Sequence, residues 1–164
     1  MISQPQEPID DTLFQSDLTH FTAFSVSGAD ATNFLQGQLT QDMTLATENH
    51  AVLSAYCSPK GRVLASFLIW KEVQADNEEI FRFLVRNDIA EPMIKRLRMF
   101  VMRSKVVFTP ETLSIKGIWS TSIEALGKRL ALDLQQMPAW QVTSKDGCTW
   151  IALPDVAGNK RFIC

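Results

Sequence analysis

The chain has 164 residues, 46% of them hydrophobic and 21% charged, which is an ordinary composition for a globular domain with a substantial core. Its formal net charge of −2 gives no overall attraction to nucleic acid, and no apolar run approaches the roughly 18 residues of a membrane span. Three scattered cysteines form neither a disulfide framework nor a paired Cys-x-x-Cys metal site. We therefore expect a cytoplasmic protein with no membrane association and no bound metal.

The first elements are expected in this order. Residues 1–11 hold mainly Gln, Pro, Glu and Asp with little to bury, so they predict a flexible leader. Residues 13–16 predict a short strand, and residues 20–26 alternate well enough to predict a second one. A helix is expected next, with Ser27 as its cap and its end near residues 39–42.

A β-hairpin is expected in the middle of the chain. Pro59 fixes φ near −65° for a turn at residues 58–61, and Gly61 can adopt the positive φ that such a turn favours. Short apolar segments rich in strand formers flank this turn. The run at residues 63–70 has so few polar breaks that it predicts a strand buried on both faces.

The next segment predicts a strand at residues 80–85 and then a helix. Asn87 is a plausible cap for this helix, which would extend to about Met102 with Pro92 near its start. A basic stretch, residues 95–105, has apolar residues at helical spacing. This pattern favours an amphipathic helix with a solvated face, and we do not expect direct nucleic-acid binding.

The second half repeats the order of elements in the first. It predicts a strand at 113–119, a helix from Ser120 to about Asp133, and three further strands before the sequence stops at Cys164. We therefore expect an α+β fold of two repeated strand-helix-three-strand subdomains, residues 12–110 and 111–164, the second incomplete. Such strings of elements are common in α+β folds, so the similarity could also arise by chance.

Two motifs resemble those of a known family. Asn33-Phe-Leu-Gln-Gly-Gln-Leu-Thr-Gln-Asp42 and Tyr56-Cys-Ser-Pro-Lys-Gly-Arg-Val-Leu64 resemble segments of the YgfZ folate-binding proteins, which are related to the glycine-cleavage T-protein. The resemblance runs from about Leu18 to Cys164 and corresponds to the N-terminal part of that family. It implies a fold of two repeated subdomains with exchanged strands, and a longer protein that continues into a Lys-Gly-Cys-x-x-Gly-Gln-Glu motif.

The resemblance also implies tetrahydrofolate as the ligand and four contact residues. Asn87 follows a strand as a folate-contacting asparagine does in the T-protein, Asp42 and Met43 follow the first motif, and Arg62 could meet the anionic glutamate tail. Each has a structural alternative, because Asn87 could cap its helix, Asp42 could brace a turn and Arg62 could be a solvated hairpin charge.

The resemblance makes enzymatic activity doubtful. The T-protein carries an aspartate pair, one of them catalytic, where this chain has Ala65 and Ser66, and neither side chain can relay a proton as a carboxylate does. We assign no catalytic residue. The expected function is folate binding that supports iron-sulfur cluster assembly or repair and thereby tRNA modification, with iron-sulfur proteins as partners. The alternatives are an aminomethyltransferase or other one-carbon folate enzyme, and a structural half that needs its missing C-terminal part to hold ligand.

Overall fold

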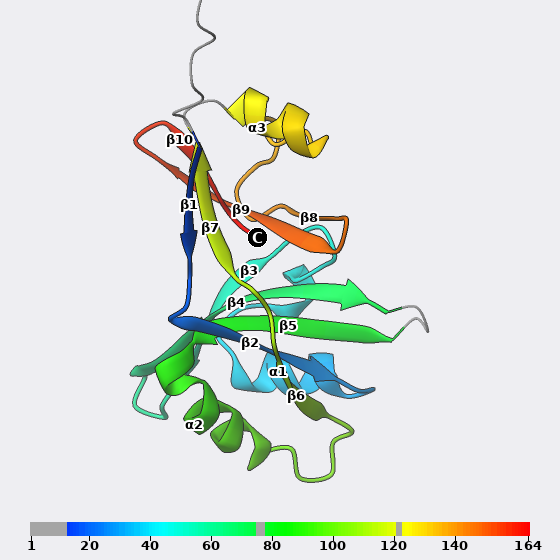
Figure 1. Ribbon diagram of the computed structural model, residues 1–164. Coiled ribbons are helices and arrows are strands. Elements are labelled where there is room, and N and C mark those ends of the chain that lie inside the picture. The colour runs from blue at the N-terminus through cyan, green and yellow to red at the C-terminus, as the bar shows by residue number, and fades with distance from the viewer. Residues whose placement is uncertain (1–12, 75–77, 121–122) are drawn as a thin grey trace, which may run out of the picture.

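The computed structural model describes residues 13–74, 78–120 and 123–164 (Figure 1). Within them lie two five-stranded antiparallel sheets. The predicted leader, residues 1–11, lies outside the described residues. None of the helices in the described part is long and apolar enough to cross a membrane.

The two sheets have matching strand orders. The first sheet follows the order β3 (Val52–Cys57), β4 (Val63–Val73), β5 (Glu79–Arg86), β2 (Phe21–Ser27) and β6 (Val107–Glu111). The second sheet follows the order β8 (Val142–Lys145), β9 (Cys148–Val156), β10 (Asn159–Ile163), β7 (Lys116–Ser120) and β1 (Leu13–Asp17). The strand β1 thus comes from the N-terminal part of the chain but pairs with β7, whereas β6 completes the first sheet.

The helices are α1 (Ala31–Gln38), α2 (Asn87–Arg98) and α3 (Ile123–Leu130), and a short 3-10 helix, η1, covers Met43–Leu45. The helices α1 and α2 contribute Phe34, Leu35 and Leu97 to a large aromatic core on one face of the first sheet, where the Phe24 and Phe83 rings stack with centroids 4.7 Å apart. This burial is the main source of stability for an eight-residue helix such as α1, which would be marginal alone in water.

The opposite face of the first sheet packs against the second sheet. Leu68, Trp70 and Leu84 of the first sheet form one buried cluster with Val142 and Ile151 of the second. Figure 1 shows the second sheet on the side of the first sheet that faces away from α1 and α2. The two faces of each central strand therefore have different neighbours, since successive side chains point to opposite sides.

The predicted hairpin is confirmed. The strands β3 and β4 pair in antiparallel register, the N–H of Gly61 donates to the Ser58 carbonyl at 2.9 Å, and Gly61 has a φ of +74°. The prediction that residues 63–70 are buried on both faces is wrong for the first part of this run, because Val63 and Leu64 are 64% and 38% exposed. The second sheet covers only the end of β4 that contains Leu68 and Trp70.

Two predicted caps are also wrong. Ser27 ends β2, and the residue that precedes α1 is Asp30, whose carboxylate accepts from the Lys105 N–H at 2.7 Å instead of capping the helix. Asn87 is the first residue of α2, and Arg86 occupies the cap position without a side-chain hydrogen bond that caps the helix. For Asn87, a contact with a distant segment takes the side chain that local sequence assigned to the helix end, since its amide donates to the Thr19 carbonyl.

Candidate ligand site at the open end of the first sheet

The segments that carry the family resemblance meet at one end of the first sheet. The N–H of Thr40, in the first motif, donates to the Ala55 carbonyl at 3.0 Å, and the Ala55 N–H donates to the Thr40 hydroxyl at 3.0 Å. Ala55 pairs in turn with Ser66 of β4. Tertiary pairing therefore places the first motif beside the hairpin that contains the second.

Asn87 lies at the same end. Leu68 pairs with Leu84, and two residues further along these strands are Ser66 and Arg86, the residue before Asn87. Arg86 also pairs with Phe21 of β2. The surface formed by Leu53, Ala55, Leu64, Ser66 and Arg86 is hereafter called the open end, because the second sheet does not cover it.

The open end has both apolar and polar groups. Leu53 pairs with Leu68 and so lies on the face that is turned towards the second sheet, yet it is 53% exposed. The register shifts nearer the hairpin turn, from Tyr56 opposite Ala65 to Cys57 opposite Val63, which leaves Leu64 as the extra residue of a β-bulge. Bulges bend a strand and re-aim its side chains, and here the bulge leaves two apolar residues of β4 exposed at the surface.

Ser66 and Ala65 have different environments. Ala65 is 3% exposed and lies in the aromatic core with Phe67, whereas Ser66 is exposed and its side chain points to the face of the open end. Of the two positions, only 66 could present a carboxylate to a ligand at the open end. The serine there supplies one hydroxyl and no charge at neutral pH.

Asp88, two residues after Arg86, and Asp42, at the end of the first motif, already have partners. Arg86 forms a two-pronged ion pair with Asp88 at 3.1 and 2.9 Å, and hydrogen bonding from this guanidinium lowers the pKa of Asp88. The hydroxyl and N–H of Thr44 donate to Asp42 at 2.7 and 2.9 Å and lower its pKa. A general base works best with a pKa near the working pH, so neither carboxylate is suited to that task.

The four predicted contact residues occupy different positions. Asn87 is exposed, and its amide nitrogen donates to the Thr19 carbonyl at 3.0 Å. One N–H of this side chain is therefore used within the fold, whereas its carbonyl oxygen can still accept from a ligand. Arg62 is exposed at the hairpin turn. Asp42 is exposed and caps η1, and the Met43 side chain is fully buried in the aromatic core. The structure thus leaves Asn87, Arg62 and Asp42 accessible at the surface, while Met43 is closed off.

Arg86 and Ser66 were not among the predicted contact residues. The signal for Arg86 was its position directly before Asn87 at the end of a strand, where alternation places it on the face opposite Val85. The sequence contained no signal that this face would be uncovered at residue 66 and covered at residue 68. Which part of a strand is covered depends on where the second sheet sits.

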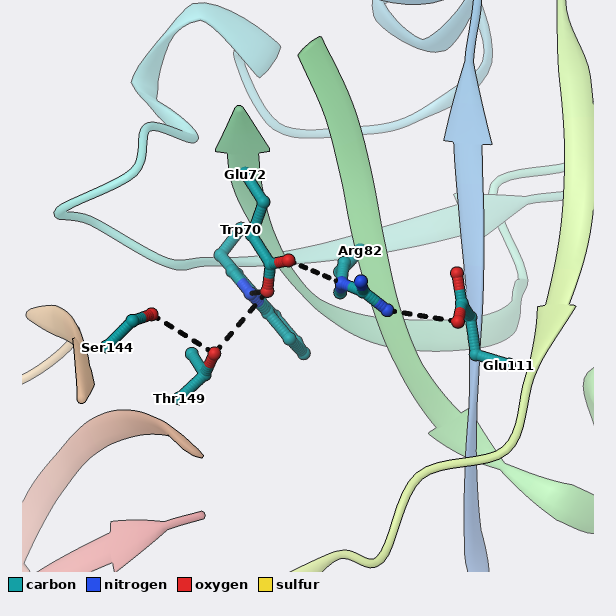
Figure 2. A network of polar contacts seen from close by, with 6 residues as sticks. All are labelled: Trp70, Glu72, Arg82, Glu111, Ser144 and Thr149. Carbon is teal, nitrogen blue, oxygen red and sulfur yellow. Dashed lines mark hydrogen bonds and ion pairs between the residues drawn. The ribbon is translucent and has the colours of Figure 1, made fainter. Parts of the chain in front are cut away.

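A second polar cluster lies where the two sheets meet (Figure 2). Glu72 accepts from the Trp70 indole at 2.9 Å, from Arg82 Nε at 2.8 Å and from the Thr149 hydroxyl at 3.4 Å, so it links both sheets. Arg82 also lies 3.1 Å from Glu111 through Nη1, without an aligned hydrogen bond. This cluster joins β4, β5 and β6 to β9, and we assign it a structural role.

Among the described residues, no group of three or more His, Cys, Asp or Glu side chains could hold a metal ion. The open end places apolar side chains beside the Ser66 hydroxyl and the Arg86 guanidinium, and the exposed Asn87 amide follows Arg86 in the chain.

Comparison with known proteins gives relatives of this chain. No family model matches the chain. It is 30% identical over 119 residues to an uncharacterized protein of Haemophilus influenzae, covering 73% of this chain and 41% of that protein. It is 29% identical over 87 residues to the tRNA-modifying protein YgfZ of Shigella boydii and of Escherichia coli, covering 53% of this chain and 25% of each relative.

The fold is shared with a solved aminomethyltransferase. The glycine cleavage system aminomethyltransferase T from Bartonella henselae superimposes with a TM-score of 0.72 at 15% identity, over 93% of this chain and 41% of that one. The chain thus spans well under half the length of the relatives that it matches.

Proposed function

We propose that this chain binds a reduced folate at its open end without transferring a one-carbon group. The chain is a homologue of the YgfZ proteins and has the fold of a glycine cleavage aminomethyltransferase. The observation that carries this proposal is the convergence of Thr40, Ser66 and Arg86 beside exposed Leu53 and Leu64. We further propose, from the family resemblance, that the whole protein supports iron-sulfur cluster assembly or repair and thereby tRNA modification.

The chemistry of a reduced folate suits this surface. A folate combines a flat pterin rich in donors and acceptors with an aromatic linker and an anionic glutamate tail, and such ligands bind to apolar walls with a few polar groups. Leu53 and Leu64 offer the apolar contact. The carbonyl oxygen of Asn87 can accept from the pterin, while Arg62 carries a charge of the sign that the tail requires.

Aminomethyl transfer is the competing function, and Ser66 argues against it. A carboxylate that carries charge or a proton during transfer would have to stand at position 66, because Ala65 faces the core. A serine hydroxyl, which carries no charge, cannot replace it as an acid or base near neutral pH. Binding without transfer therefore accounts better for the residues at the open end.

Titration of the 164-residue chain with tetrahydrofolate under reducing conditions tests the proposal. We expect saturable binding by calorimetry, weakened by at least about tenfold, or 1.4 kcal/mol, in Ser66→Trp, whose indole would occupy the open end. The matched control is Ser16→Trp, since Ser16 is also an exposed strand serine but lies in β1 of the second sheet. Absence of saturable binding, or equal weakening in both variants, would contradict the proposal.

Turnover distinguishes the two functions. With an aminomethyl donor and tetrahydrofolate present, we expect no product from the wild-type chain. Product formation by the wild type would show that the surface does more than bind folate and would favour the transferase function.

A further inference from the structure

The end of α2 and the turn after it concentrate positive charge. Residues 95–105 contain five of the 16 Lys and Arg residues of the chain and none of its 18 Asp and Glu residues. Four of the five cationic side chains are exposed and Arg96 is half-buried. We call this segment the basic tip; its cationic residues are Lys95, Arg96, Arg98, Arg103 and Lys105.

The cations of the basic tip have no ion-pair partner; Lys60, Arg62 and Arg161 have none either among the described residues, but they do not form a cluster of five in one short segment. Within the described residues, no carboxylate lies within ion-pair distance of these five side chains, whereas six other cationic residues are paired in this way: Lys71, Arg82, Arg86, Lys116, Lys128 and Lys160. Arg96 donates instead to the Tyr56 hydroxyl at 3.1 Å, and Arg98 donates to the Phe108 carbonyl at 2.6 Å. Neutral acceptors fix these two guanidinium groups but leave their charge intact.

Apolar side chains project between the cations. Met99, Phe100 and Met102 are 67%, 45% and 88% exposed, although each belongs to a residue type that is usually buried. The C-terminal end of a helix dipole favours nearby cations and so accounts for Lys95, Arg96 and Arg98. It accounts neither for Arg103 and Lys105, which lie beyond the helix, nor for the exposed apolar residues.

The turn that carries these residues is fixed at its far end. The Lys105 N–H donates to the Asp30 carboxylate at 2.7 Å, and the Asp30 N–H donates back to the Lys105 carbonyl at 3.3 Å. Within the turn the Ser104 N–H donates to the Val101 carbonyl at 2.8 Å. The exposed side chains are therefore presented by an ordered backbone.

A groove adjoins the basic tip and shares two of its cations. It has a volume of about 480 Å³ between α2 and the strands β2 and β6, with Ala90, Ile94 and Pro110 as apolar walls and Lys95 and Arg98 among its lining residues. The side chains of Thr22 and Glu91 also line it. The groove thus combines apolar walls with polar groups able to meet the edge of a planar base.

We propose that the basic tip binds an unpaired strand of nucleic acid, with its phosphates on the five cations, a base stacked on Phe100 and a neighbouring base at the groove. Single strands bind where cations follow the backbone and aromatic rings stack on bases. Arginine suits phosphate because its planar fork can donate two hydrogen bonds at once. The inference goes beyond folate binding, since the basic tip lies on the α2 side of the first sheet (Figure 1).

A lipid surface fits these residues less well. A helix that lies on a membrane needs a free apolar face, but Ala90, Met93 and Leu97 of α2 are buried in the aromatic core. The exposed apolar residues that remain are confined to the turn. Binding to anionic vesicles is therefore the alternative outcome against which the proposal is tested.

The test is fluorescence anisotropy with a labelled twelve-nucleotide RNA of unstructured sequence, with DNA of the same sequence in a second arm. For single strands, the slope of log affinity against log salt concentration is about −0.7 for each phosphate contact. If five phosphates are neutralised, the affinity should therefore fall about 100-fold between 50 and 200 mM salt. The double variant Lys95→Gln, Arg103→Gln should bind more weakly and lower this slope by about 1.4. Equal affinities for RNA and DNA would show that the basic tip recognises the phosphodiester backbone that both share.

The control variant is Lys128→Gln, Lys160→Gln, which changes the net charge equally but removes cations that are ion-paired elsewhere. We expect it to bind as the wild type does, and Phe100→Leu to bind about tenfold more weakly through lost stacking. No binding at 50 mM salt, an equal loss in both double variants, or tip-dependent binding to phosphatidylserine vesicles alone would overturn the proposal. Tetrahydrofolate titration of the tip variant should match the wild type, which separates this outcome from the folate proposal.

Discussion

Gly28 offers a sharp test of how the first sheet and the basic tip are joined. It follows β2 with a φ of +111°, and a Cβ added at this position would lie 2.2 Å from the Lys105 carbonyl oxygen and 3.3 Å from Val106 Cα. Both obstructing atoms belong to the backbone. A change of side-chain rotamer therefore cannot relieve the clash, and the carbonyl is also the acceptor for Asp30.

The expected destabilisation follows from two effects. Forcing a side chain into a backbone conformation that suits glycine costs about 1–3 kcal/mol, and overpacking costs about as much again. We expect Gly28→Ala to lower the free energy of unfolding by about 3–5 kcal/mol. At roughly 2–4 °C per kcal/mol for a domain of this size, the midpoint of thermal unfolding should fall by about 10 °C or more.

Gly37→Ala is the matched control for the same chemical change. Gly37 lies inside α1, its φ is not positive, and a Cβ there would have no neighbouring atom within 4 Å. Alanine at an open helix position stabilises by about 0.5–1 kcal/mol. Both variants can be compared by circular dichroism during urea unfolding. A free energy within about 1 kcal/mol of wild type for Gly28→Ala would refute the close approach of Gly28 to Lys105, given the cost of strain.

Two further predictions concern the interface between the sheets and the reactivity of Cys148 and Cys164. Arg82→Met should lower the free energy of unfolding by about 2–3 kcal/mol, because Glu72 and Glu111 would lose their shared cation. The loss should be smaller than for a fully buried ion pair, since the Arg82 side chain is 17% exposed. Unchanged urea unfolding would contradict the structural role of Arg82. Iodoacetamide at pH 8 should label the exposed Cys148 before Cys164. Burial, together with the neighbouring Cys148 thiol, raises the pKa of Cys164 to about 11, so little of its reactive thiolate is present at pH 8. Labelling of Cys164 should accelerate between pH 9 and 11, as measured by peptide mass spectrometry, and equal rates at pH 8 would count against its burial.

The sequence by itself determined the elements whose cause is local. The hairpin of β3 and β4 was predictable because Pro59 and Gly61 restrict the turn and the strands are adjacent in the chain. The helix α2 was predictable from its periodicity, although it ends at Arg98 rather than near Met102. The strand β6 was missed; it contains Pro110, which is tolerated because β6 lies at the edge of its sheet.

Only the tertiary structure decided the site. The motifs indicated which segments matter, and the hairpin that pairs Ala55 with Ser66 was predictable, but the contact of Thr40 with Ala55 and the position of Arg86 near Ser66 depend on tertiary pairing that the motifs do not encode. The same holds for exposure: Leu68 is buried and Leu53, its partner across the strands, is half-exposed, because the second sheet ends between them. Sequence fixes the side chains on a strand face, whereas the packing of the two sheets decides which of them a ligand can reach.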